Sequence, residues 1–173
     1  KKHNGFIAGA STGKSGYLAT MVIAYIRELI FTQNILGETM ETSVPWSKIN
    51  KVKSEAHKML NELHKKHKLP GKPFFTSRIS KIYHTGVCMY NTIAMCYDGV
   101  ENPEDVFTQI EYSLRENFIK NGGSISHHHG VGKLRKDFMK ETISDGSVAL
   151  IQGIKKDQDP NNIFGVGNNI VND

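Results

Sequence analysis

The sequence has few of the residues that would set it apart from ordinary globular proteins. It holds two cysteines and five prolines in 173 residues, which excludes a disulfide scaffold and a proline-rich linker. No apolar run is long enough to span a bilayer, because Arg27 and Glu28 interrupt the best candidate at residues 17–31. With 38% hydrophobic and 23% charged residues, the composition predicts a soluble domain with its own core.

The start of the chain also lacks familiar signals. It carries neither an initiator Met nor a signal peptide, so we expect a fragment or a processed piece. Residues 1–15 are expected to form a mobile lead-in, residues 16–120 a substrate or cap domain, and residues 121–173 a loop with a C-terminal helical segment.

The net charge of +5 would suit an anionic partner. The lysines of residues 47–68, however, alternate with apolar positions instead of forming one basic stripe, a pattern typical of a solvated helix face. We therefore expect no nucleic acid partner.

The two cysteines, Cys88 and Cys96, lie eight residues apart in a single expected strand. At the rise of a β-strand this spacing is roughly 26 Å, far beyond what a disulfide allows. Two unpaired thiols fit a reducing intracellular compartment.

Hydrophobic periodicity predicts the α+β class, with an antiparallel sheet backed by helices. The expected elements are a helix at 17–33, a strand at 34–46, a helix at 47–68, strands at 74–84 and 86–98 joined as a hairpin, and a helix from about 102 to 122. The first helix is apolar almost all round, which predicts burial on several sides. Arg27 within it would then need an acidic side chain or a bound anion as its partner.

Alternation in the strand at 86–98 separates two faces. One face is mostly large and apolar and should pack on helices. The other carries Tyr90 among the small residues Cys88, Thr92, Ala94 and Cys96. That arrangement fits either a pocket around the phenol or a tyrosine packed against another layer.

Residues 8–15 (Ala-Gly-Ala-Ser-Thr-Gly-Lys-Ser) fit a relaxed phosphate-loop pattern. The pattern is short, its first glycine is replaced by Ala8, and the rest lacks the strand and helix alternation of a parallel sheet. We therefore do not favour a nucleotide hydrolase.

A second motif, Ser-His-His-His-Gly-Val-Gly-Lys at 126–133, places three histidines on a glycine-rich loop. Imidazoles can transfer protons or bind metal near neutral pH. Adjacent histidines in an extended stretch point alternately, and the chain has no CxxC or HExxH to supply further ligands. We therefore expect no metal site.

Residues 37–46, 121–136 and 159–165 closely resemble the alkylglycerone-phosphate synthase family, and the likeness runs from about residue 16 to residue 169. The His run is its most specific part. More broadly, the Gly-Val-Gly and Asp-Pro-Asn-Asn segments are similar to the C-terminal half of flavin-linked oxidases of the vanillyl-alcohol-oxidase type.

This resemblance implies an FAD-dependent transferase of ether-lipid and plasmalogen synthesis. The family exchanges the acyl chain of acyl-dihydroxyacetone phosphate for a long-chain fatty alcohol, without net redox chemistry. The resemblance makes Tyr90 the catalytic proton acceptor and donor, Arg27 the substrate-binding arginine, and His127, His128 and His129 essential histidines. An oxidase or dehydrogenase of a hydroxy acid is the alternative.

The family also implies partners for this chain. FAD would be bound mainly by a preceding domain of the same protein, with Phe164, Asn168 and Asn169 approaching it from this chain. A homodimer, peripheral membrane contact and a peroxisomal location are expected on the same ground, although the chain shows no targeting signal of its own.

Overall fold

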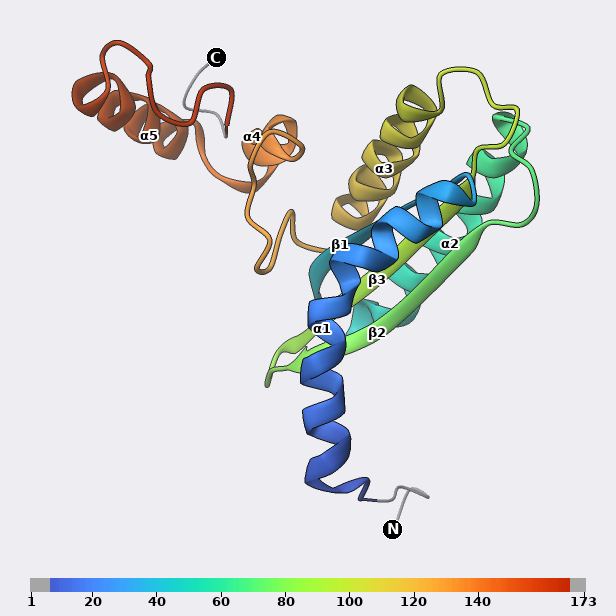
Figure 1. Ribbon diagram of the computed structural model, residues 1–173. Helices are drawn as coiled ribbons and strands as arrows, with labels where there is room; N and C mark the ends of the chain where they lie inside the picture. The colour runs from blue at the N-terminus through green and yellow to red at the C-terminus, as the bar shows by residue number, and fades with distance from the viewer. Residues whose placement is uncertain (1–6, 169–173) are drawn as a thin grey trace.

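The computed structural model describes residues 7–168, apart from the side chain of Ala24, and has an α+β architecture (Figure 1). In chain order the elements, with η for a short 3₁₀ helix, are α1 (Gly9–Thr32), β1 (Ile35–Pro45), η1 (Trp46–Lys48), α2 (Ile49–Lys66), β2 (Phe74–Ile82), β3 (Gly86–Cys96), α3 (Pro103–Lys120), η2 (Lys136–Phe138), α4 (Met139–Thr142) and α5 (Asp145–Gln158). The predicted fold class is confirmed.

The three strands form one antiparallel sheet in the order β1-β3-β2, with the predicted β2–β3 hairpin. The register sets Glu41 of β1 and Arg78 of β2 on either side of Tyr90 in β3. Directly paired residues of antiparallel strands point to the same face, so these three side chains share one face of the sheet.

The opposite face of the sheet carries the main core. Buried Met89, Ile93 and Met95 of β3 pack there with the apolar stripes of α2 and α3. Those stripes consist of Val52, Ala56 and Leu60 on α2, and Ile110, Leu114 and Phe118 on α3, at helical spacing. The alternation predicted for β3 is therefore confirmed.

Local signals account for both ends of α3. Pro103 stands in its first turn, where a missing N–H costs nothing, and Glu104 and Asp105 face the positive end of the helix dipole. The helix stops before Gly122, which adopts φ of 95°, a left-handed conformation that favours glycine.

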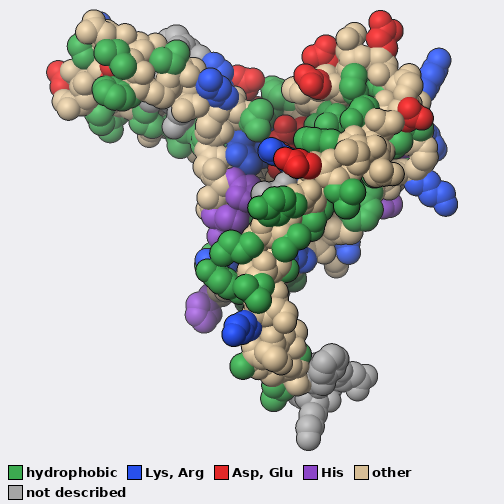
Figure 2. Space-filling model, viewed as in Figure 1, with side chains coloured by type: hydrophobic (Ala, Val, Ile, Leu, Met, Phe, Trp, Pro, Cys, Tyr) green, Lys and Arg blue, Asp and Glu red, His purple; other side chains and the backbone are tan. Residues whose placement is uncertain are grey.

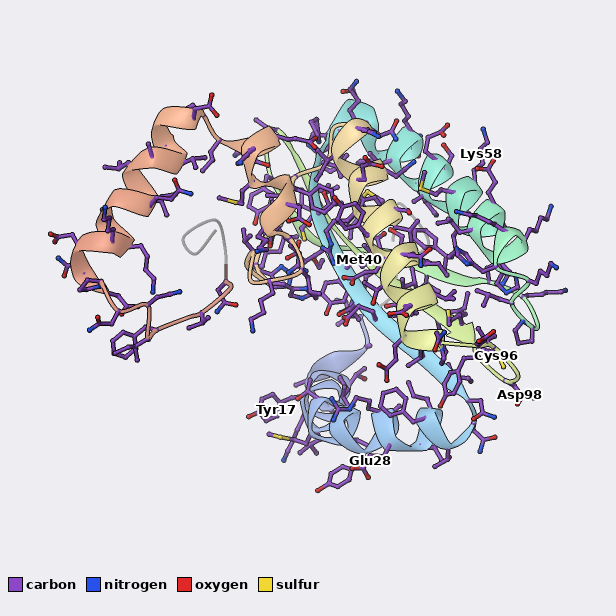
Figure 3. The ribbon with its side chains drawn as sticks, turned by 90° about the horizontal axis from the view of Figure 1, so that it is seen from above. Tyr17, Glu28, Met40, Lys58, Cys96 and Asp98 are labelled. Atoms are coloured by element: carbon purple, nitrogen blue, oxygen red, sulfur yellow. The ribbon has the colours of Figure 1, made fainter. Side chains whose placement is uncertain are left out.

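The prediction that the first helix is buried is wrong for this chain. Figure 3 shows α1, with Tyr17 and Glu28, on the opposite side of the sheet from α2 and α3. Its apolar residues are exposed, and in the space-filling view hydrophobic side chains gather over it (Figure 2). Only its last turns meet the sheet, where Tyr97 donates a hydrogen bond to the carbonyl of Phe31 at 3.2 Å. The apolar pattern called for a covering layer that the described residues do not supply.

The position of α1 is also inconsistent with a phosphate-binding loop at residues 8–15. α1 begins at Gly9, so Gly13, Lys14 and Ser15 lie within a helix instead of a loop. Their backbone does not form the cradle that such a loop wraps around phosphate. Although α1 is long, none of the described helices is apolar enough to cross a membrane.

The C-terminal part has a small core of its own. Ile125, Phe138, Met139 and Val148 are buried together and hold α4 and α5 beside the sheet domain (Figure 1). The rings of Tyr112 in α3 and Phe138 lie 4.7 Å apart and link the two cores. Cys88 and Cys96 are free, as predicted.

Replacement of Leu114 by Ala tests the main core. The side chain of Leu114 is fully buried, so Leu114→Ala should lower the free energy of unfolding by about 2–5 kcal/mol. The matched change Leu150→Ala removes the same atoms from a helix residue that is 65% exposed and should alter it by at most about 0.5 kcal/mol. Urea denaturation of the chain measures both, and equal losses would contradict this description of the core.

Candidate functional site

Glu41 of β1 holds the His run in place. Its buried carboxylate accepts the backbone N–H groups of His127, His128 and His129 at 2.7, 3.2 and 2.7 Å, and the hydroxyl of Ser126 at 2.7 Å. Burial raises the pKa of Glu41, but the N–H donors of the His run and the Ser126 hydroxyl outweigh it, so the pKa lies below the usual value. The carboxylate stays charged and fixes the loop backbone.

The loop before the His run comes close to β1 and to the end of α3 at Gly123. A Cβ at this position would lie 2.5 Å from the Thr42 hydroxyl and 2.9 Å from the carbonyl of Phe118. The next residue, Ser124, then pairs with β1, because its N–H donates to the carbonyl of Ser43 at 2.9 Å. Only a glycine lets the loop lie this near the strand.

Tyr90 lies among the residues that the register and the loop bring to it. Its hydroxyl donates to Thr39 at 3.2 Å. The rings of His128 and His129 lie 5.8 and 5.5 Å from its ring, and the Arg78 guanidinium lies 4.7 Å from the ring centroid, a cation–π contact. The structure thus brings together the predicted tyrosine and the predicted histidines, although no contact tests their roles.

A chain of polar contacts connects the first two histidines to the hairpin. The hydroxyl of Tyr83 lies 2.6 Å from Nε2 of His127, and the Nδ1 atoms of His127 and His128 lie 2.9 Å apart. Each imidazole can donate from one nitrogen and accept at the other. The three side chains can therefore pass a proton along the edge of the site.

His129 is held differently from its two neighbours. Burial lowers its pKa, and His128 and Arg135 add to this effect, while Glu41, with Oε1 3.8 Å from Nδ1, opposes it. The net pKa lies below the usual value, so the imidazole is neutral at neutral pH. A neutral imidazole beside Tyr90 can accept a proton.

The structure does not connect Arg27 to this cluster. Arg27 is exposed on α1, and among the described residues it makes no ion pair and no contact with Tyr90 or the His run. The expectation of a buried arginine is wrong because α1 itself is exposed. Its proposed role in substrate binding stays a prediction.

The predicted flavin-facing residues lie at the end of the described chain. Phe164 and Asn168 are exposed, and Asn169 lies outside the described residues. A Cβ at Gly167 would lie 3.7 Å from Cε of Lys133, so this segment returns to the end of the His-run motif. The approach of these residues to a flavin stays a prediction.

Asp159, from the Asp-Pro-Asn-Asn segment, fixes that return. Its carboxylate accepts a hydrogen bond from the ammonium group of Lys155. It also accepts hydrogen bonds from the backbone N–H groups of Ile163 and Phe164, both at 2.9 Å. The Lys155 bond and these N–H donors lower the pKa of Asp159 to about 2. The turn after α5 is thereby shaped by one charged group.

Sequence reasoning missed four residues of the site, namely Glu41, Thr39, Arg78 and Tyr83. Thr39 and Glu41 lie two residues apart in the first predicted strand, so they share one face. Arg78 could be placed beside Tyr90 only with the hairpin register, and Tyr83 only with the position of the loop.

The structure also adds a thiol to the histidines. Cys88 of β3, His127 and His128 each offer a ligand atom, and these atoms lie within 4.8 Å of one another. The argument from alternation considered the histidines alone and could not foresee this approach.

Comparison with known proteins gives a family for most of the chain. Residues 11–168 match the model of the FAD linked oxidases, C-terminal domain. The chain is 36% identical over 168 residues to an alkyldihydroxyacetonephosphate synthase of Caenorhabditis elegans, covering 97% of this chain and 28% of that protein. It is 31% identical over 154 residues to the uncharacterized FAD-linked oxidoreductase YgcU of Escherichia coli strain K12, covering 84% of this chain and 30% of that protein.

A solved structure of an alkyldihydroxyacetonephosphate synthase has the same fold. It superposes with a TM-score of 0.56 at 19% identity, over 80% of this chain and 22% of that one. The chain thus spans between a fifth and a third of the length of these relatives.

Replacement of Glu41 by Gln tests the anchor. The variant loses the charge that accepts the loop N–H groups, so its free energy of unfolding at pH 7 should fall by at least about 1.5 kcal/mol. The folded-state pKa of Glu41 lies below its ordinary 4.5, so the stability it contributes is present above that pH and is lost as the pH falls below it.

The difference between wild type and Glu41→Gln should therefore shrink below about pH 4.5, as measured by urea unfolding across pH. Glu62→Gln, on the exposed surface of α2, serves as the control and should show no such dependence. A difference that stays constant down to low pH would contradict the role of the Glu41 charge.

Proposed function

The chain belongs to the family of FAD linked oxidases, C-terminal domain, and on that premise we propose that it is the substrate-facing part of an alkyldihydroxyacetonephosphate synthase. The complete enzyme would exchange the acyl chain of acyl-dihydroxyacetone phosphate for a long-chain fatty alcohol. A relative of that name aligned over nearly the whole chain supports the proposal.

The observation that carries the proposal is the setting of Tyr90. The phenol lies on the sheet face opposite the core, against two imidazoles and beneath a guanidinium. The face also carries the small residues Thr92, Ala94 and Cys96, each only partly buried. This combination gives proton-transfer groups beside open space for a substrate.

These groups match the needs of the exchange. The alcohol oxygen forms a bond to the dihydroxyacetone carbon, the bond from that carbon to the acyl oxygen breaks, and a fatty acid leaves. Atoms balance without an oxidant, because the proton lost by the alcohol is taken up by the leaving group. Tyr90 would accept and return that proton, and His129, neutral at neutral pH, would assist it.

FAD, when bound, would supply the site that holds the reacting carbon. Phe164 and Asn168 are exposed and would face the flavin, and the described residues cover the Tyr90 face only with α1 and the His-run loop. We propose that the flavin domain of the same protein provides the cover, including that of the apolar residues on α1.

Tyr90→Phe tests the function in the complete protein. Removal of the phenol oxygen should lower the rate of alkyl exchange by about 10²–10⁴-fold and leave the flavin absorption spectrum unchanged. Tyr97→Phe removes a hydroxyl whose one hydrogen bond within the described part of the chain is to the carbonyl of Phe31, and it should keep most activity. A radiolabelled fatty alcohol measures the exchange, and substantial activity in Tyr90→Phe would remove Tyr90 from the mechanism.

An FAD-dependent oxidase or dehydrogenase of a hydroxy acid is the second candidate, favoured by the similarity to an FAD-linked oxidoreductase. Anaerobic addition of substrate separates the two. Lasting bleaching of the flavin by a hydroxy acid means net hydride transfer and would overturn the synthase proposal, whereas the synthase keeps its flavin oxidised.

Arg27→Ala tests the proposed substrate contact. If the exposed guanidinium binds the substrate phosphate, this change should raise KM for acyl-dihydroxyacetone phosphate by about 10-fold or more with little change in kcat. Lys14→Ala removes another exposed cation of α1 and should leave KM unchanged. Steady-state kinetics measure both, and an unchanged KM in Arg27→Ala would exclude the contact.

A further inference from the structure

Cys88, His127 and His128 come together from two distant parts of the chain. Cys88 lies on β3, on the same face as Tyr90, and the two histidines lie on the loop that Glu41 holds against β1. The ligand atoms of the three side chains lie within 4.8 Å of one another. This cluster has no part in the function proposed above beyond the histidines themselves.

The imidazoles of His127 and His128 lie so close that a proton or a cation has to lie between them. Their Nδ1 atoms are 2.9 Å apart, and two nitrogen lone pairs at that distance repel each other unless a proton or a cation lies between them. The hydroxyl of Tyr83, 2.6 Å from Nε2 of His127, can accept a hydrogen bond from Nε2–H, which leaves the lone pair on Nδ1. This is the support that metal-binding histidines receive from a second partner.

The thiol of Cys88 is also available as a ligand. Its side chain is buried, and the one hydrogen bond of its Sγ among the described residues is a weak donation of 3.9 Å to the carbonyl of Met89. A thiolate with two imidazoles is a donor set that favours Zn²⁺ and similar soft cations over Mg²⁺ or Ca²⁺.

We propose that Cys88, His127 and His128 bind one thiophilic divalent cation of the Zn²⁺ type. Ligand bonds of about 2.0–2.3 Å in a tetrahedral site place ligand atoms roughly 3.3–3.7 Å apart. The three ligand atoms now lie within 4.8 Å of one another, so an ion would draw them together by small side-chain movements, of the exposed His128 among others. Water would supply a fourth ligand.

The loop backbone is already fixed for this purpose. Glu41 accepts the N–H groups of both histidines, so the ion would order side chains and not the chain itself. In a neutral pair the proton between the two Nδ1 atoms would move to Nε2 of His128 as the ion binds, and the Cys88 thiol would lose its proton to the solvent. Binding should therefore release protons.

Zn²⁺ titration of the complete protein tests the site. The protein is reduced, treated with a chelator, and titrated in a calorimeter in two buffers of different ionisation enthalpy. We expect one Zn²⁺ site per chain that Cys88→Ser removes or weakens by at least about tenfold. The heat should differ between the buffers, because protons are released.

Matched variants decide the outcome. Cys96→Ser changes the other thiol of the same strand and should keep the site, whereas His128→Ala, at an exposed position, should lose it. If Cys88→Ser or His128→Ala binds Zn²⁺ as the wild type does, or if the wild type takes up no Zn²⁺, the proposal is wrong. The titration measures binding without substrate, so it does not depend on the function proposed for Tyr90.

Discussion

One buried carboxylate decides the shape of the site. Glu41 accepts the backbone N–H groups of three consecutive histidines and the hydroxyl of Ser126, so a loop without regular structure acquires a fixed backbone. Glu41 lies in β1 directly opposite Tyr90 in β3, so the register of the sheet determines where the loop meets Tyr90. Strand pairing therefore sets where Glu41 lies, and the Glu41 charge sets where the loop lies.

The sequence predicted the parts of this molecule that depend on local patterns. Alternation in β3 separated the core face from the Tyr90 face, and helical spacing identified α2 and α3 with their packed stripes. These patterns work because the partners of each element, one sheet face and two helices, are all present in the chain.

The predictions from the sequence that were wrong or incomplete also share a physical cause. The apolar residues of α1 predicted a buried helix, but the described residues leave them exposed, and Arg27 with them. The contacts of Tyr83, Arg78 and Cys88 depend on where a loop and a hairpin register bring distant residues, and no local pattern records that. An acid within a strand, such as Glu41, has no periodic signal that distinguishes an anchor from a solvated side chain.

Gly123 shows how the site can be lost although all of its reactive side chains are kept. A single methyl group there would overlap the Thr42 hydroxyl and the end of α3, and the loop would have to move away from β1. A Gly123→Ala variant would keep every histidine and Tyr90. A comparison of the reactive side chains alone would therefore not detect the damage. The position of the His-run loop therefore depends on the missing side chain at residue 123 as much as on the groups that hold the loop.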